Sequence, residues 1–139
     1  MTVTLTPEYF NQFSRQHLPE HLGIVVTEVR EGALLAEVEV RPILLAPNGF
    51  LHGGSVAALA DTCAGYGCIA HLPAGATGFT TIELKTNYLG TAREGWVECL
   101  ATPAHLGRTT QVWDATVRAK GSDRAIALFR CTQLVLYGK

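Results

Sequence analysis

The chain has 139 residues, of which 47% are hydrophobic and 17% charged, and its formal net charge is −1. This length suits one domain with one hydrophobic core, so we expect a single domain over residues 1–139 and exclude a disordered chain. Eleven basic and twelve acidic residues without a run give no footprint for nucleic acid or an anionic membrane surface. The start, MTVTLTPEYF, lacks the basic and apolar regions of a secretory leader, so we expect a cytoplasmic protein.

The N-terminal segment, residues 5–23, has the pattern of an amphipathic helix. Thr6 suits the N-cap, Pro7 suits the first helical position, and the helix should end before Pro19. The apolar positions of this predicted helix are Tyr9, Phe10, Phe13 and Leu18. Next, residues 24–29 and 33–42 flank a short break, and the second stretch alternates apolar with charged residues, which predicts a hairpin.

The segment GFLHGGSVAALADTCAGYG, residues 49–67, predicts a long helix from Gly53 to about Leu72. Its length could suit a membrane span. Asp61 at mid-length, four glycines between positions 53 and 67, and the lack of basic flanks argue instead for a helix buried by protein.

The rest of the chain reads as long antiparallel strands separated by turn residues. We expect these strands at residues 79–89, 95–106, 109–120 and 125–137. In the first of them the alternation places two sets of side chains on opposite faces: Ile82, Leu84, Thr86 and Tyr88 on one, and Thr81, Glu83, Lys85 and Asn87 on the other. The predicted fold class is α+β, with a curved sheet of five to six strands wrapped around the long helix and a short N-terminal helix.

Two alternative chemistries are not supported by the spacing of the residues. The cysteines lie in apolar or strand-like segments and lack the spacing of metal ligands, so we expect reduced thiols and no metal site: Cys63, Cys68, Cys99 and Cys131. The glycines at positions 65 and 67 resemble a dinucleotide fingerprint, but they lie inside a helix rather than between a strand and a helix. We expect no cofactor.

The remaining candidates are the glycines at the helix start and Asp61. Gly53 and Gly54 have backbone N–H groups suited to polarising a carbonyl, or they only permit a tight entry turn. Asp61 has small neighbours on its helix, so it faces a ligand, a hydrogen bond in the core, or another subunit. Eight residues at about 1.5 Å each put Gly53 and Asp61 roughly 12 Å apart. If both are catalytic, two antiparallel helices across a two-fold axis must bring Gly53 of one chain to Asp61 of the other.

The segment HGGSVAALADTCAGYG resembles that of the hotdog-fold acyl-CoA thioesterases, in particular the phenylacetic-acid-degradation (PaaI-type) branch, and the order of flanking strands agrees over residues 22–137. The resemblance implies a hotdog fold, a homodimer usually doubled to a homotetramer, and hydrolysis of an acyl-CoA thioester to a carboxylate and free coenzyme A. It also implies that the Gly53 N–H polarises the carbonyl and that Asp61 of the partner subunit is the nucleophile or the general base.

The resemblance extends to further positions. Thr81 would orient water or be a plain strand threonine, and His52 would bond near the thioester or brace the turn. Arg108 and Thr109 fall where relatives contact the nucleotide phosphates, or Arg108 is a solvated turn arginine, and Gly54 and Gly65 would line the substrate site.

One position departs from the family pattern. Relatives carry Asn or Gln six residues before the histidine, where this chain has Ala46, so Asn48 takes that role or the role is vacant. The competing functions are a hydratase or dehydratase acting on acyl thioesters, which would pair His52 with the carboxylate, and a non-catalytic acyl-CoA-binding protein.

Overall fold

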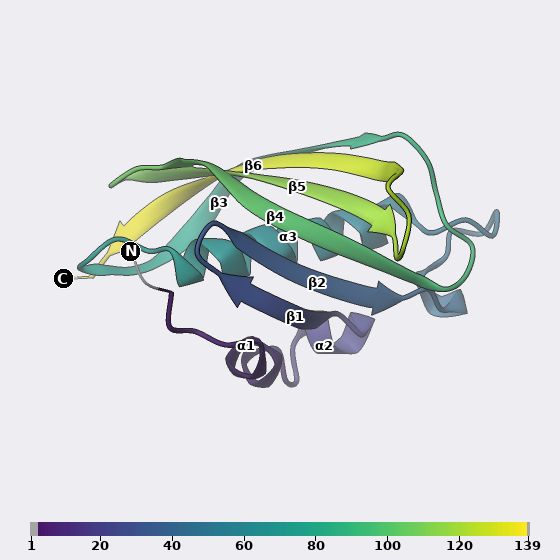
Figure 1. Cartoon of the computed structure of the whole chain (residues 1–139), viewed down its shortest axis with the longest axis horizontal. Helices are drawn as coiled ribbons and strands as arrows, with labels where there is room; N and C mark the ends of the chain where they lie inside the picture. Colours follow the sequence, from purple (N-terminus) through teal and green to yellow (C-terminus); the bar gives the residue numbers. More distant parts are fainter. Residues whose placement is uncertain (1–2, 139) are drawn as a thin grey trace.

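The computed structural model describes residues 3–138. Within this range, a curved six-stranded antiparallel sheet encloses one long helix, and two short helices lie beside β1 (Figure 1). The elements in chain order are α1 (Pro7–Phe13), α2 (Leu18–Leu22), β1 (Val25–Arg30), β2 (Ala33–Glu39), η1 (Pro42–Leu44), α3 (Gly53–Ala70), β3 (Ala76–Tyr88), β4 (Trp96–Leu106), β5 (Thr110–Ala119) and β6 (Ala125–Tyr137). The predicted hotdog architecture is confirmed.

The strands are arranged in the order β1-β2-β4-β5-β6-β3, so β1 and β3 form the two edges of the sheet. The hairpin predicted from the alternation of apolar and charged residues is the β1–β2 pair. The consecutive strands β4, β5 and β6 pair with one another through short turns, and β3 pairs with the far side of β6. The segment that follows α3 therefore becomes an edge strand.

The helix α3 is the centre of the core, as its nearly continuous apolar sequence predicts. It contacts β2, β4, β5, β3 and β6. A glycine in a helix costs roughly 0.5–1 kcal/mol relative to alanine, but here two of them allow aromatic rings to approach the helix closely. A Cβ at Gly65 would lie 3.1 Å from the Phe79 ring, and one at Gly67 would lie 2.7 Å from the Trp113 ring.

The predicted N-terminal helix is wrong in its extent, because the structure divides it into α1 and α2. The start is as predicted: the Thr6 hydroxyl accepts a hydrogen bond from the Tyr9 N–H at 3.1 Å. The helix ends at Phe13, the backbone of Gln16 has a φ of 65°, and Pro19 lies in the first turn of α2. Proline is tolerated in the first turn of a helix, where its missing N–H costs no helical hydrogen bond, whereas within one continuous helix it would remove such a bond.

The predicted faces of β3 are wrong on one side of a bulge. The pairing with β6 shifts between Thr81 and Glu83, so Thr81 lies opposite the buried Gln133 and Leu84 lies opposite the buried Cys131. Side chains directly opposite in an antiparallel pair share a face, so Thr81 and Leu84 both lie on the inner face. The extra residue in the bulge reverses the simple alternation.

The inner face of β3 is also less covered than the alternation suggests. Leu84 is 46% exposed and Tyr88 is 51% exposed, although both lie opposite buried residues of β6. Ile82, at the bulge, is 58% exposed. The helix α3 therefore leaves this half of the inner face open within one protomer.

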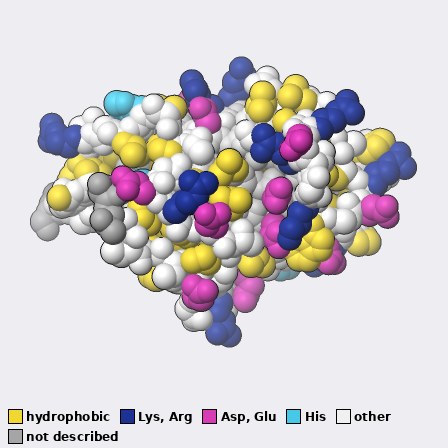
Figure 2. Space-filling view, viewed as in Figure 1, with side chains coloured by type: hydrophobic (Ala, Val, Ile, Leu, Met, Phe, Trp, Pro, Cys, Tyr) yellow, Lys and Arg dark blue, Asp and Glu magenta, His cyan; other side chains and the backbone are white. Residues whose placement is uncertain are grey.

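The face seen in Figure 2 mixes charges of both signs with apolar side chains. Two of the ion pairs on or beside the strands are Lys120 with Glu37 at 2.8 Å and Arg130 with Asp114, where the guanidinium donates to both carboxylate oxygens at 2.5 and 2.8 Å. The Arg130 guanidinium lowers the pKa of Asp114 through this hydrogen bond. The mixture agrees with the even charge balance of the sequence.

Candidate active site

The first turn of α3 leaves one backbone donor available. His52 is the N-cap, and its Nδ1 accepts a hydrogen bond from the Gly54 N–H at 2.7 Å. Its carbonyl accepts from the N–H groups of Ser55 and Val56 at 2.9 and 3.1 Å. Among residues 3–138, the Gly53 N–H has no hydrogen-bond partner. The positive end of a helix thus presents a free donor at the position that the sequence singles out.

The entry turn before Gly53 is fixed by bonds to two other segments. The Leu44 carbonyl accepts from the His52 N–H at 3.0 Å and from the Ser55 hydroxyl at 2.9 Å. The Leu51 N–H donates to the Ala92 carbonyl at 2.8 Å. The backbone on both sides of the free donor is therefore anchored.

His52 braces this turn. Because its Nδ1 accepts from Gly54, the proton of the neutral ring lies on Nε2, which is not part of that bond. His52 precedes Gly53 and lies at the same end of α3, so a single protomer does not pair it with Asp61.

Asp61 lies in the middle of α3 with one carboxylate oxygen buried. That Oδ1 has no hydrogen-bond partner among the described residues, and burial raises the pKa of the carboxyl above its ordinary value. An unpaired carboxylate in such a place costs free energy unless a ligand or a partner satisfies it. Gly53 and Asp61 do lie on one helix, so their backbones are about 12 Å apart along its axis. One protomer does not bring them together.

Asp61 precedes Gly65 by one helical turn, and Gly65 faces the Phe79 ring of β3. The carboxylate is therefore on the side of α3 that turns toward the open edge of the sheet. Gly65 itself is buried, and a side chain there would meet the ring at 3.1 Å. The lack of a side chain at Gly65 thus lets the Phe79 ring pack against the helix one turn from Asp61.

The bulge brings Thr81 to the inner face on the same strand. Its hydroxyl donates to the Gln133 Oε1 at 2.7 Å. The Thr81 proton is thus already committed, and the oxygen is left as an acceptor. Gln133 is fully buried, a polar position that sequence reasoning missed because nothing in the alternation of β6 distinguishes it.

Asn48 is occupied within its own loop. Its side-chain Oδ1 accepts from the Phe50 N–H at 3.1 Å, and the residue is exposed. The structure therefore places Asn48 as a turn residue, with only its amide N–H groups left to donate.

Arg108 and Thr109 lie in the turn between β4 and β5, far from Gly53 of the same chain. The Arg108 carbonyl accepts from the Tyr137 hydroxyl, and the Thr109 carbonyl accepts from the Val135 N–H at 2.9 Å. The residue after this turn, Thr110, lies opposite Leu134, which in turn lies opposite Thr80 of β3. Gly53 is bonded to Tyr88, eight residues further along β3. At about 3.3 Å per residue, Thr80 and Tyr88 are roughly 26 Å apart along the strand. Arg108 accordingly lies toward the Phe79 end of the molecule.

Tyr88 is a contact of the site that sequence reasoning did not assign. Its hydroxyl donates to the Gly53 carbonyl at 2.7 Å. The only signal in the sequence is its place in the alternation of β3, which gives a face but not a partner on a helix.

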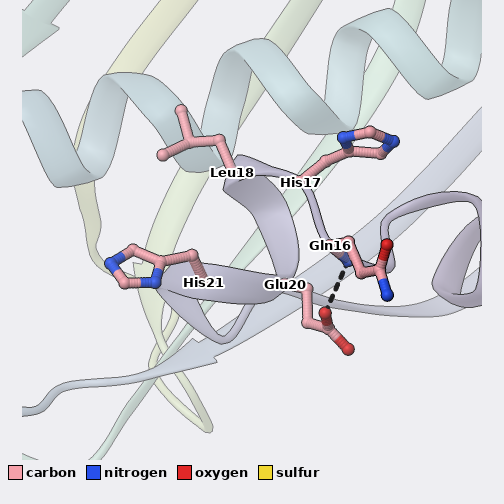
Figure 3. A pocket seen from close by; sticks show the side chains of 5 residues that line it. All are labelled: Gln16, His17, Leu18, Glu20 and His21. Atoms are coloured by element: carbon pink, nitrogen blue, oxygen red, sulfur yellow. Dashed lines mark hydrogen bonds between the residues drawn. The ribbon is translucent and has the colours of Figure 1, made fainter.

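A surface hollow of about 460 Å³ lies at α2, away from these residues (Figure 3). It is lined by Gln16, His17, Leu18, Glu20 and His21. The two imidazoles point away from each other, and the Glu20 carboxylate accepts from the Gln16 N–H at 2.7 Å. Within residues 3–138, no group of three or more His, Cys, Asp or Glu side chains could hold a metal ion.

Comparison with known proteins assigns the chain to a family. The model of the Thioesterase superfamily matches residues 48–126. The chain is 30% identical over 115 residues to a 1,4-dihydroxy-2-naphthoyl-CoA hydrolase of Listeria monocytogenes, covering 83% of this chain and 92% of that protein. The chain belongs to the Thioesterase superfamily, and it is an enzyme of the thioester hydrolase class.

Solved structures agree with this assignment. A thioesterase of Haemophilus influenzae superposes with a TM-score of 0.90 at 31% identity, covering 96% of this chain and 92% of that one. A mutant thioesterase of Pseudomonas aeruginosa superposes with a TM-score of 0.91 at 27% identity, covering 97% and 96%. No helix among residues 3–138 has the length and apolar character needed to cross a membrane.

Proposed function

We propose that the chain is an acyl-CoA thioesterase, of the PaaI-type branch, whose active site is shared by two protomers. The observation that carries the proposal is the pair of unsatisfied groups on α3: the free Gly53 N–H and the buried, unpaired oxygen of Asp61. They lie about 12 Å apart on one rigid helix. Two copies of α3, antiparallel across a two-fold axis, satisfy both groups at two identical sites.

The edge strand β3 supplies the surface for this homodimer. Its backbone is paired on one side only, and its inner face exposes Leu84 and Tyr88 beside α3. An unpaired edge strand readily adds a strand from another chain, and burial of exposed apolar side chains favours the association. A partner that pairs along β3 places its own α3 against this open half of the inner face.

The chemistry follows from the two groups. The Gly53 N–H bonds to the thioester oxygen, and the bond strengthens as negative charge develops on that oxygen. As a nucleophile, Asp61 of the partner subunit adds to the carbonyl carbon, the C–S bond breaks, and water hydrolyses the resulting anhydride. As a general base, Asp61 takes a proton from water, and the water oxygen adds to the carbonyl carbon before the C–S bond breaks and the thiolate leaves. In both routes the thiolate takes up a proton and the products are a carboxylate and free coenzyme A.

Other predicted residues would act around this centre. His52 would brace the turn through its bond to Gly54, Thr81 would accept a hydrogen bond from water, and the Asn48 amide would donate from the loop. Gly54 and Gly65 would line the substrate site. Arg108 and Thr109 would contact the phosphates of coenzyme A, since a guanidinium forms paired hydrogen bonds with phosphate oxygens. The Listeria relative is named as a coenzyme A thioester hydrolase, which supports this substrate class.

The substitution Asp61→Asn tests the proposal. It keeps the size of the side chain but removes the nucleophile or base, so kcat for benzoyl-CoA should fall at least about a hundredfold while the protein remains folded. The measurement is release of free thiol. Activity close to that of the unmodified protein would reject the role of Asp61, and tight binding of benzoyl-CoA without thiol release by the unmodified protein would favour an acyl-CoA-binding protein instead. Hydration of an enoyl-CoA without thiol release would favour a hydratase.

The shared site has its own test in mixed dimers. Gly53→Pro removes the N–H, and proline suits this first helical position because His52 already has φ −64° and ψ 135°. Gly53→Ala keeps the N–H and adds a Cβ, so the pair separates loss of the donor from added bulk. Mixed dimers of one Gly53→Pro chain and one Asp61→Asn chain should regain part of the activity. One of their two sites then has both an unmodified Gly53 and an unmodified Asp61. Verified mixed dimers without recovery would argue against this geometry.

The doubling of the dimer to a homotetramer is a separate proposal. Apolar side chains on the outer part of β6, Leu128, Leu134 and Leu136, are exposed and suit a second contact between copies. Analytical ultracentrifugation should give the mass of four chains, and Leu128→Lys should reduce it to two without loss of thioesterase activity.

A further inference from the structure

We infer that Tyr88 is a positioning residue that fixes the direction of the Gly53 N–H, an inference that rests on the proposed thioesterase function. The Tyr88 hydroxyl donates to the Gly53 carbonyl at 2.7 Å. Its ring also lies against the Cα of Gly53, because a Cβ at that position would be 3.2 Å from two of its atoms. One side chain thus contacts the proposed donor residue through both a hydrogen bond and a packed ring.

The start of α3 needs such a contact. Gly53 and Gly54 open the helix with two residues that lack side chains, and glycine has the largest conformational freedom to lose on folding. The first turn of a helix also has the fewest internal hydrogen bonds. A donor that polarises a carbonyl is effective only if its direction is fixed before the reaction. Other bonds anchor the residues on both sides of Gly53, and the Tyr88 hydroxyl adds a bond from another element to Gly53 itself.

The bond of Tyr88 acts on position rather than on the polarity of the donor. The Gly53 carbonyl belongs to the peptide group that carries the Gly54 N–H, and that N–H is already bonded to the Nδ1 of His52. The Gly53 N–H belongs to the preceding peptide group. Tyr88 therefore holds the Gly53 backbone in place, together with the bond from Leu51 to Ala92 on the other side of the turn.

Tyr88 also connects the donor to the proposed dimer interface. It is the last residue of β3, the edge strand along which the partner is proposed to pair. Fixing that strand by association fixes the phenol, and the phenol fixes the helix start. Full activity would accordingly require the dimer even at the half-site that contributes Gly53.

The experiment compares Tyr88→Phe with Tyr137→Phe. Both variants lose a half-exposed phenol that donates to a backbone carbonyl, Gly53 for Tyr88 and Arg108 for Tyr137. For benzoyl-CoA, Tyr88→Phe should lower kcat about tenfold and leave KM within about twofold. A less well positioned N–H donor should slow the reaction, but by less than complete removal of the donor would. Tyr137→Phe should keep kcat.

Amide hydrogen exchange separates positioning from direct contact with substrate. The N–H groups of Ser55 and Val56 bond to the His52 carbonyl in the same turn, so they should exchange several-fold faster in Tyr88→Phe. A lower kcat with unchanged exchange would overturn the positioning role, and so would an unchanged kcat. If Asp61→Asn abolishes turnover while Tyr88→Phe is fully active, the proposed function stands and only the role of Tyr88 fails. An unmodified protein without thioesterase activity would instead reject the proposed function itself.

Discussion

The two edges of the sheet are treated in opposite ways. At β1, the side chain of Asn11 from α1 pairs with the edge: its amide donates to the Val26 carbonyl at 3.0 Å and accepts from the Val26 N–H at 2.8 Å. At β3, the described residues offer no such contact, and Ile82, Leu84 and Tyr88 are about half exposed. One edge is closed within the chain, and the other is left open.

The difference gives the molecule one direction of assembly. An edge strand with free N–H and C=O groups is a template for another strand, and proteins cover the edges where association is unwanted. Asn11 supplies both a donor and an acceptor, as a neighbouring strand would, so it blocks addition at β1. The open edge is the one beside Asp61 and Tyr88. In the proposed homodimer, closing the β1 edge leaves the partner the side on which the proposed site lacks half its residues.

The largest expected effect comes from a charge at the open edge. Leu84→Lys places an ammonium on the inner face of β3, where the single protomer leaves it hydrated but a partner would bury it. In the Leu128→Lys background, which lacks the proposed second contact, we expect a folded monomer, measured by sedimentation, and a loss of thioesterase activity of at least about a hundredfold because each site lacks half its residues.

The matched control lies at the closed edge. Val25 of β1 is 42% exposed, close to the 46% of Leu84, so Val25→Lys adds the same charge at a similar exposure. In the same Leu128→Lys background it should remain dimeric and active. A Leu84→Lys dimer with full activity would show that β3 is not the interface, and a monomeric Val25→Lys would show that the two edges do not differ.

A smaller effect is expected at β1 itself. Asn11→Ala removes both hydrogen bonds to Val26 and should lower the free energy of unfolding by about 1–3 kcal/mol, the usual cost of leaving part-buried backbone groups unpaired. Urea denaturation measures the loss. Asn11→Asp retains the acceptor for the Val26 N–H. At low pH, where its carboxyl is protonated, its free energy of unfolding should lie between those of Asn11→Ala and the unmodified protein. Unchanged stability in Asn11→Ala would contradict the closing role.

The sequence allows the central elements to be predicted because their patterns are local. A nearly continuous apolar stretch gives α3, turn residues separate the four long strands, and the helical rise alone shows that Gly53 and Asp61 cannot meet in one chain. The division of the N-terminal helix follows from Pro19, whose position was visible, but the break at Gln16 depends on how α1 packs. Tertiary packing decided that boundary.

The parts that could not be predicted are those set by pairing between distant strands. The bulge near Thr81 depends on the register of β3 against β6, two strands that lie about 50 residues apart in the chain. The bonded pair Thr81 and Gln133 is 52 residues apart. No local alternation records such a shift. The contact of Tyr88 with Gly53 joins residues 35 positions apart and is equally hidden. The proposed catalytic pair is thus accessible to sequence reasoning, whereas the residues from distant strands that contact this region are not.

The smallest expected effect is a difference in the titration of two aspartates. Burial raises the pKa of Asp61 on the open side, and the bond from Arg130 lowers that of Asp114 on the strands. In a ¹³C titration of the side-chain carboxyls, Asp61 should have its midpoint above the ordinary value of about 3.9 and Asp114 should have its midpoint below it. Because the proposed mechanism needs the ionised form of Asp61, kcat should fall as the pH drops through the raised pKa, before Asp114 takes up its proton.

The two aspartates also affect the free energy of unfolding in opposite ways. The stabilisation from Asp114 is present above its unfolded pKa and is lost as the pH falls through its folded pKa. The stabilisation from Asp61 is present at low pH and is lost as the pH rises through its folded pKa. Asp61→Asn should therefore gain stability relative to the unmodified protein as the pH rises, and a loss of stability at neutral pH would indicate that a partner already satisfies the Asp61 carboxylate in the dimer.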